Sequence, residues 1–174
     1  VVQPLIALMQ DQVQEFNEAA AAAGEGAPRA CYLGTAQEDE ETEQEALDGR
    51  YCLVYVTPEK LVGTTFLAGL KQLMDEGRLV LMAVDEAQCI TEWGSDFRPH
   101  YRELYFVRQE YPELLLLALT GIKTPMVFDD IVKYLQLRDP YSSVDTCDRP
   151  NLGISRLRKA HAQQNSRLRV IQDV

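Results

Sequence analysis

Two adjacent acids, Asp85 and Glu86, are the residues of this sequence best suited to do chemistry. They follow an apolar run, 79–84, which predicts a strand buried on both faces of a parallel sheet. Ligands bind at the carboxyl ends of strands in open α/β sheets. There, one carboxylate can hold Mg²⁺, and the other can orient or deprotonate a water that attacks a phosphate. The alternative is a strand followed by a helix whose N-terminus favours acids.

A second group of side chains, aromatic and basic, follows the two acids directly. Flat rings and a guanidinium stack on unpaired bases and bind phosphates, so this composition is typical of a contact with single-stranded nucleic acid. Aromatic residues four apart are also common in a protein core, and that alternative stays open. The group consists of Trp93, Phe97, Arg98, His100 and Tyr101.

The elements that must position these residues alternate along the chain. Apolar and β-branched runs predict strands at 30–33, 51–56, 79–84 and 114–119, and the end of another strand within 1–5. Helical periodicity and helix start and stop signals predict helices at 5–16, 35–48, 66–74, 101–110 and 128–137. This alternation predicts an α/β fold, a mostly parallel sheet with helices on both faces.

The segment 85–101 closely resembles motif II and the aromatic-rich loop of RecQ-type DNA helicases, which belong to helicase superfamily 2. The usual family form is DEAH followed by C-I-S-x-W-G-H-D-F-R-P-x-Y. Gln88, Thr91 and Ser95 stand where that family has His, Ser and His. The resemblance implies a RecA-like helicase domain. The matching residues are Asp85, Glu86, Ala87, Cys89, Ile90, Trp93, Gly94, Asp96, Phe97, Arg98, Pro99 and Tyr101.

Two earlier segments resemble the same family. Residues 3–13 match motif Ia, S-P-L-x-x-L-M-x-D-Q-V, with Gln3 in place of Ser. They also fit an ordinary amphipathic helix with a proline at its start. Thr57, Pro58 and Glu59 match a motif that contacts the nucleic-acid backbone in relatives. The same three residues suit an N-cap, a first helical position and an acid in the first turn, so both interpretations stand.

Two later segments also resemble the family. Residues 118–124 are similar to motif III, A-L-T-A-T-A, which couples nucleotide hydrolysis to movement between domains; Thr120 and Thr124 match, whereas 121–123 depart. Residues 148–152 resemble the x-R-P-N-L segment that runs toward the second helicase domain. We therefore expect 1–152 to be part of a first RecA-like helicase ATP-binding domain and 153–174 to be a basic linker.

The resemblance implies a role for each matching residue. Asp85 would hold Mg²⁺ through water, Glu86 would position or activate the attacking water, and Gln88 would communicate between ATP and DNA. Thr120 and Thr124 would couple hydrolysis to movement. The implied activity is ATP-dependent 3′–5′ unwinding of single-stranded and forked DNA in repair and recombination. Contacts with DNA are expected from Trp93, Phe97, Arg98, Tyr101, Pro4, Gln12, Thr57, Pro58 and Glu59.

The composition limits the class of protein. A net charge of −10 argues against a general nucleic-acid coat, so any polynucleotide contact must be local. The cysteines form no C-x-x-C pair, which argues against a zinc ribbon, and Cys31, Cys52 and Cys89 are expected to be buried thiols. Without an apolar run of membrane-spanning length or a signal-peptide pattern, we expect an intracellular protein, nuclear if its source is eukaryotic and otherwise cytoplasmic.

No G-x-x-x-x-G-K-[ST] loop occurs in the 174 residues. In the family this phosphate loop precedes motif Ia, so we expect it before Val1, and we expect the second helicase domain with its arginine after Val174. The chain alone should then bind ATP poorly and unwind no DNA. Two alternatives remain: a catalytically inactive nucleic-acid-binding module derived from a helicase domain, and an RNA helicase of the same superfamily.

Overall fold

The computed structural model describes residues 1–34, 40–91, 98–122, 124–145 and 151. Its compact unit is Val1–Pro140, and a second unit, Tyr141–Val174, follows. The boundary predicted at 152 stays a prediction. Among the described helices, none is both long and apolar enough to cross a membrane.

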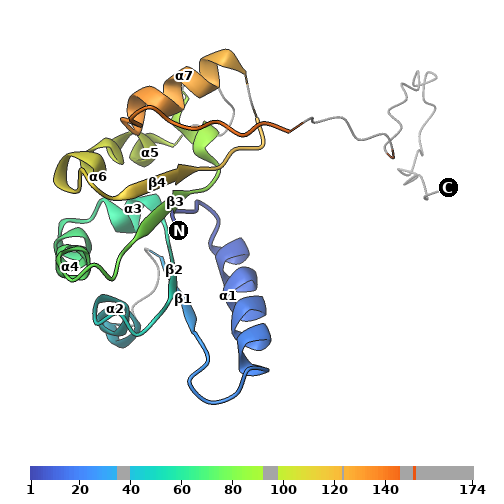
Figure 1. The fold of residues 1–174 in the computed structure, drawn as a ribbon, viewed down its shortest axis with the longest axis vertical. Coiled ribbons are helices and arrows are strands. Elements are labelled where there is room, and N and C mark those ends of the chain that lie inside the picture. The colour runs from blue at the N-terminus through green and yellow to red at the C-terminus, as the bar shows by residue number, and fades with distance from the viewer. Residues whose placement is uncertain (35–39, 92–97, 123, 146–150, 152–174) are drawn as a thin grey trace, which may run out of the picture. The chain divides into compact units, whose positions relative to one another are not determined.

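The strands of the compact unit pair in parallel, as the alternation of elements predicts. β1 (Ala30–Leu33) pairs with β2 (Leu53–Val56), and β3 (Leu81–Val84) pairs with β4 (Leu115–Ala118). Val2 joins the two pairs, because it forms parallel bridges to both Val56 and Val84. The N-terminal residues therefore lie in the middle of the sheet, between β2 and β3 (Figure 1).

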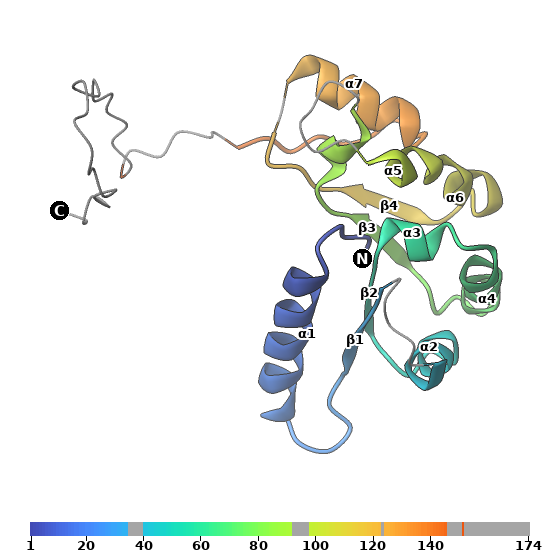
Figure 2. The ribbon, with the colours of Figure 1, turned by 180° about the vertical axis from the view of Figure 1, so that it is seen from behind.

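Helices cover both sides of the β1–β2 pair. Figures 1 and 2 both show α1 on one side of these strands and α2 on the other, and both helices contact β1. A short helical segment, η1, follows β3 and contacts α5 and α7. The helices are α1 (Ile6–Ala21), α2 (Glu40–Leu47), α3 (Pro58–Leu61), α4 (Thr64–Asp75), η1 (Ala87–Ile90), α5 (Pro99–Glu103), α6 (Tyr105–Glu110) and α7 (Pro125–Tyr134).

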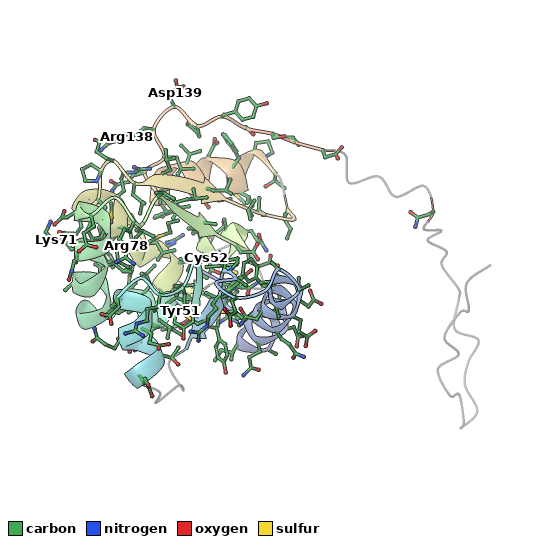
Figure 3. All side chains as sticks on the ribbon, turned by 60° about the horizontal axis from the view of Figure 1, so that its bottom comes forward. Tyr51, Cys52, Lys71, Arg78, Arg138 and Asp139 are labelled. Atoms are coloured by element: carbon green, nitrogen blue, oxygen red, sulfur yellow. The ribbon has the colours of Figure 1, made fainter. Side chains whose placement is uncertain are left out.

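Glycines end two of the helices. Gly49 follows α2 with φ of +69° and Gly77 follows α4 with φ of +67°, a conformation that costs glycine little. The side chain of Arg78 (Figure 3) caps the C-terminal end of α2, because its Nη2 donates to the carbonyls of Asp48 at 2.9 Å and Gly49 at 2.8 Å. The acidic helix is thus held to the segment that leads into β3.

Helix α7 begins three residues earlier than the predicted start at Phe128. Thr124 is its N-cap, with a side-chain oxygen that accepts from the Val127 N–H at 3.2 Å, and Pro125 is its first residue. A threonine followed by a proline is a helix start signal that sequence reasoning missed here. Cys52 is a second correction, because its side chain is exposed, whereas Cys31 and Cys89 are buried.

The predicted burial of the 79–84 strand on both faces is wrong for β3, and its neighbour β4 is exposed on the same face. Met82 and Val84 lie in the core, but Leu81 is 46% exposed and its partner Leu115 is 68% exposed. Side chains alternate between the two faces of a strand, so one face of the β3–β4 pair is buried and the other is open. The apolar runs 79–84 and 114–119 lack alternation, and so carry no signal of this asymmetry.

Candidate nucleotide and nucleic-acid site

Asp85 continues the sheet ladder by one residue beyond β3. Its N–H donates to the Val2 carbonyl at 2.9 Å, so the backbone that carries the carboxylate is fixed by the central strand. One carboxylate oxygen, Oδ1, accepts from the N–H of Glu86 at 2.9 Å. The other, Oδ2, accepts from the Gln3 amide at 3.0 Å. The acid therefore lies at the carboxyl end of a parallel strand, as predicted, in one defined orientation.

Glu86 has a left-handed backbone, with φ of 48° and ψ of 42°. Non-glycine residues seldom adopt this conformation, and those that do are often held there at functional sites. The turn starts η1, whose Cys89 N–H donates to the Glu86 carbonyl at 2.9 Å. The strained turn directs the chain from β3 into η1 within two residues, and it gives the two adjacent acids different surroundings.

Gln88 connects Glu86 to the end of β4. Its Nε2 donates to the Glu86 carboxylate, and its Oε1 accepts from the Thr120 hydroxyl at 2.6 Å. The backbone supports the same link, because the Ala87 N–H donates to the Leu119 carbonyl at 2.9 Å. The structure thus brings together three predicted site residues, Glu86, Gln88 and Thr120, from the ends of two adjacent strands.

Two tyrosines lie close to Asp85. The Tyr101 side chain is fully buried, and its hydroxyl donates to the Asp85 carbonyl at 2.9 Å. Burial raises the pKa of Tyr101, and the charge of Asp85 adds to this shift. Tyr55, on β2, also has a raised pKa, from burial first and then from Asp85. Both phenols therefore stay protonated at neutral pH.

The burial of Tyr101 corrects its predicted role. A ring without exposed surface has no face to offer to a base, so Tyr101 supports Asp85 instead of stacking on DNA. Trp93 and Phe97 lie outside the described residues. Arg98 is half-buried, and its backbone N–H donates to the Cys89 carbonyl at 2.9 Å. This hydrogen bond attaches Arg98 to η1.

The start of the aromatic segment is also fixed. Thr91 is buried, and its hydroxyl donates to the Asp130 carboxylate of α7 at 2.7 Å. Arg102 lies in α5, where its Nε donates to the Ile90 carbonyl at 2.9 Å and its guanidinium lies 4.2 Å from the centre of the Tyr134 ring. Sequence reasoning gave Thr91, Arg102 and Asp130 no role, since pairs so distant in sequence carry no local signal.

Thr57, Pro58 and Glu59 begin α3 as the capping pattern predicts. The Thr57 side chain accepts from the Lys60 N–H at 3.3 Å, and Pro58 is buried at the first helical position. Glu59 Oε1 lies 3.5 Å from His100 Nδ1 at the start of α5. The capping interpretation is confirmed for Thr57 and Pro58, whereas contact of this segment with DNA stays a prediction.

Pro4 lies two residues before α1, Gln12 lies in the second turn of this helix, and both residues are half-buried. Gln12 is six residues beyond Ile6, the first residue of α1, which corresponds to about 9 Å along the helix axis. Gln12 is therefore separated from the Asp85 corner, whereas Pro4 directly follows Gln3. Thr124, the second predicted coupling residue, caps α7 and is exposed.

The carboxylate oxygens of Asp85 are suitable ligands for Mg²⁺ that is bound together with a nucleotide. Within the described residues, no group of three or more His, Cys, Asp or Glu side chains is arranged to hold a metal ion alone. Mg²⁺ in nucleotide sites is bound by one or two carboxylates, by waters and by the substrate phosphates. Asp85, with a free lone pair on each oxygen, is sufficient for such a site.

Comparison with known protein families agrees with this geometry. The family model of the DEAD/DEAH box helicase matches residues 1–121. The chain belongs to this family. Its domain is of the RecQ type, and its parallel strands with flanking helices form the predicted α/β fold.

Three curated relatives show how much of a helicase this chain represents. It is 36% identical over 153 residues to ATP-dependent helicase SGS1 of Saccharomyces cerevisiae, covering 87% of this chain and 10% of that protein. It is 32% identical over 152 residues to ATP-dependent DNA helicase RecQ of Haemophilus influenzae, covering 87% of this chain and 23% of that protein. It is 38% identical over 152 residues to the mouse bifunctional 3′-5′ exonuclease/ATP-dependent helicase WRN, covering 87% and 10%. The chain thus spans between a tenth and a quarter of these relatives.

Proposed function

We propose that this chain is part of the first helicase domain of an ATP-dependent DNA helicase that moves 3′ to 5′ on single-stranded DNA and unwinds forked duplexes. The observation that carries the proposal is the hydrogen-bonded link from Glu86 through Gln88 to Thr120. It joins a candidate hydrolytic carboxylate to the end of the neighbouring strand. Such a connection is what a motor needs to convert hydrolysis at one strand end into movement elsewhere.

In this proposal the chain's own residues orient the reaction. ATP supplies the phosphoryl group, and Mg²⁺ neutralises charge on its phosphates. Asp85 would hold the hydrated Mg²⁺ of the nucleotide, because Gln3 and Glu86 leave one lone pair free on each of its carboxylate oxygens. Glu86 orients or deprotonates the attacking water, and the Gln88 amide fixes its carboxylate. The phosphate loop and the transition-state arginine come from segments before and after this chain.

Contacts with DNA come from the segments around this corner. Trp93, Phe97 and Arg98 sense single-stranded DNA, and the fixed ends of their segment, at Thr91 and Arg98, transmit its binding to η1. Two further segments contact the backbone of the DNA: Pro4 with the following helix α1, which carries Gln12, and the start of α3 with its N-cap Thr57, Pro58 and Glu59. The proposal includes a role in repair and recombination and an intracellular location, nuclear if the source is eukaryotic and otherwise cytoplasmic.

The experiment that tests the proposal is nucleic-acid stimulation of ATPase activity in the full-length protein. We expect single-stranded DNA to stimulate hydrolysis strongly and single-stranded RNA weakly, and we expect displacement of a strand from a fork with a 3′ tail. Substitution of Trp93 by alanine should leave basal hydrolysis intact and remove most of the stimulation. Absence of ATPase activity would favour the inactive binding module, and stronger stimulation by RNA would favour the RNA helicase.

A further inference from the structure

Gln3 is a fully buried polar residue that contacts the metal-site carboxylate directly. Its side chain is 0% exposed, and its Nε2 donates to Asp85 Oδ2 at 3.0 Å. It lies 82 positions from Asp85 in sequence. Sequence reasoning noted Gln3 only as a departure from the serine that is usual at this position of the family.

The register of the sheet explains this contact. Val2 bridges Val84, so the next residue on each strand, Gln3 and Asp85, are neighbours across the ladder. Side chains alternate along a strand, and these two therefore lie on the same face. The backbone on both sides is fixed: the Gln3 N–H donates to the Val56 carbonyl at 3.0 Å, and the Val2 N–H donates to the Ala83 carbonyl at 2.7 Å.

The bond determines how the Asp85 carboxylate is presented. Glu86 N–H occupies one lone pair of Oδ1, and Gln3 Nε2 occupies one lone pair of Oδ2. A carboxylate held at both oxygens cannot rotate, and one lone pair on each oxygen stays available. Groups that orient the ligands of a metal in this manner tune its affinity.

The second polar atom of Gln3 argues against a role in stability alone. Gln3 Oε1 is buried and has no hydrogen-bond partner among the described residues. A buried acceptor without a partner destabilises a fold, and an apolar side chain of similar volume would avoid that penalty. Positions where local stability and local chemistry conflict are characteristic of functional sites.

We propose that Gln3 is a positioning residue for Asp85, which sets the carboxylate for hydrated Mg²⁺ on the bound nucleotide. This inference rests on the proposed ATPase function. Gln3 directly precedes Pro4 and α1, so the segment proposed to follow the DNA backbone also carries the amide that orients Asp85.

The test uses the full-length protein with Gln3→Met, which keeps the volume and removes both polar atoms. We expect the affinity for Mn²⁺ in the presence of ADP, measured by electron paramagnetic resonance, to fall by roughly tenfold. The Mg²⁺ concentration for half-maximal ATPase should rise by a similar factor. Denaturant unfolding should give a stability equal to or above that of the wild type. Gln14→Leu on the exposed side of α1 is the control, and it should change none of these values.

The outcomes separate the inference from the proposed function. Unchanged Mn²⁺ affinity and unchanged Mg²⁺ dependence in Gln3→Met would overturn the role of Gln3, even in an active ATPase. A wild-type protein without ATPase activity would overturn the proposed function, and the Mn²⁺ measurement would still report on Gln3. Marked destabilisation of Gln3→Met would show a structural role instead, and Gln3→Leu repeats that comparison with a second apolar side chain.

Discussion

The two faces of the β3–β4 pair are built from the same apolar runs but differ in what covers them. On one face Met82 and Val84 are buried in the core, and on the other Leu81 and Leu115 are largely exposed. Asp85 continues the series 81, 83, 85 and so belongs to the open face. The buried face therefore supplies folding free energy, whereas the open face leads to the candidate chemistry. Substitutions on the two faces should have separable effects.

The largest effect on stability is expected on the buried face. In the 174-residue chain, Met82→Ala should lower the free energy of unfolding by about 2–5 kcal/mol, because it removes a buried side chain and leaves a cavity. Leu115→Ala, a matched truncation on the open face, should change it by about 0.5 kcal/mol or less. Urea unfolding of both variants measures the difference. Equal losses of unfolding free energy at the two positions would contradict the difference between the two faces. A larger loss for Leu115→Ala in the full-length protein would show that another segment covers the open face.

A large effect on activity with little effect on stability is expected at Gln88. Gln88→Ala should slow ATP hydrolysis by the full-length protein on the order of tenfold, about 1.4 kcal/mol in the activation free energy, because Glu86 loses its amide partner. Gln109→Ala, exposed on α6, is the control.

A double variant sharpens this result. Thr120→Val removes the other end of the link, so combining it with Gln88→Ala should cost less than the sum of the two single effects. Strictly additive losses would mean that Gln88 and Thr120 act independently.

A smaller effect is expected where Tyr101 supports Asp85 from the core. Tyr101→Phe removes only the hydroxyl, which leaves the Asp85 carbonyl with one hydrogen bond fewer, and should lower the free energy of unfolding by about 1 kcal/mol. Binding of single-stranded DNA should be unchanged, since the buried ring makes no contact with it. Weaker DNA binding by a Tyr101→Phe protein of normal stability would contradict this account and would support the direct contact with DNA that the sequence predicts.

The same magnitude is expected at the start of α7. Thr124→Ala removes the side-chain oxygen that accepts from the Val127 N–H, and should cost about 1 kcal/mol of stability. Thr124→Ser keeps the acceptor and should cost much less. A loss of ATPase activity in Thr124→Ser at normal stability would point to a coupling role beyond the cap.

The smallest effect concerns the reactivity of two thiols, that of Cys31 in β1 and that of Cys52, which directly precedes β2. Burial raises the pKa of Cys31 to about 12, so its thiol stays protonated at pH 8 and loses its proton only as the pH approaches 12. Cys52 is exposed. Iodoacetamide at pH 8, followed by peptide mass analysis, should modify Cys52 well before Cys31, and the reverse order would contradict the burial of β1.

Much of the site follows from sequence because strand ends and caps are local features. The apolar run before Asp85 places that acid at the end of a strand, and the Thr57–Pro58 pair predicts the start of α3. The rest depends on contacts between distant segments. The bond from Gln3 to Asp85 requires the sheet register, and the link from Gln88 to Thr120 requires the pairing of β3 with β4.

Other features lack a distinguishing signal in the sequence. A continuous apolar run does not show which face of a strand is covered, which is why the exposure of Leu81 and Leu115 was not predicted. An aromatic residue suits a core as well as a base stack, and Tyr101 proved to be a core residue. The left-handed turn at Glu86 follows from how η1 joins β3, and residue type gives no indication of it.

The central claim is that the carboxylate of Glu86, which directly follows Asp85 at the end of the open face, performs the hydrolytic step. Its most direct test is Glu86→Gln in the full-length protein, with Glu110→Gln on the exposed side of α6 as the matched control. We expect single-stranded-DNA-stimulated ATP hydrolysis to fall by roughly 100-fold or more while nucleotide affinity and stability are retained. Hydrolysis within about twofold of the wild type, and thus equal to the control within that margin, would contradict the account.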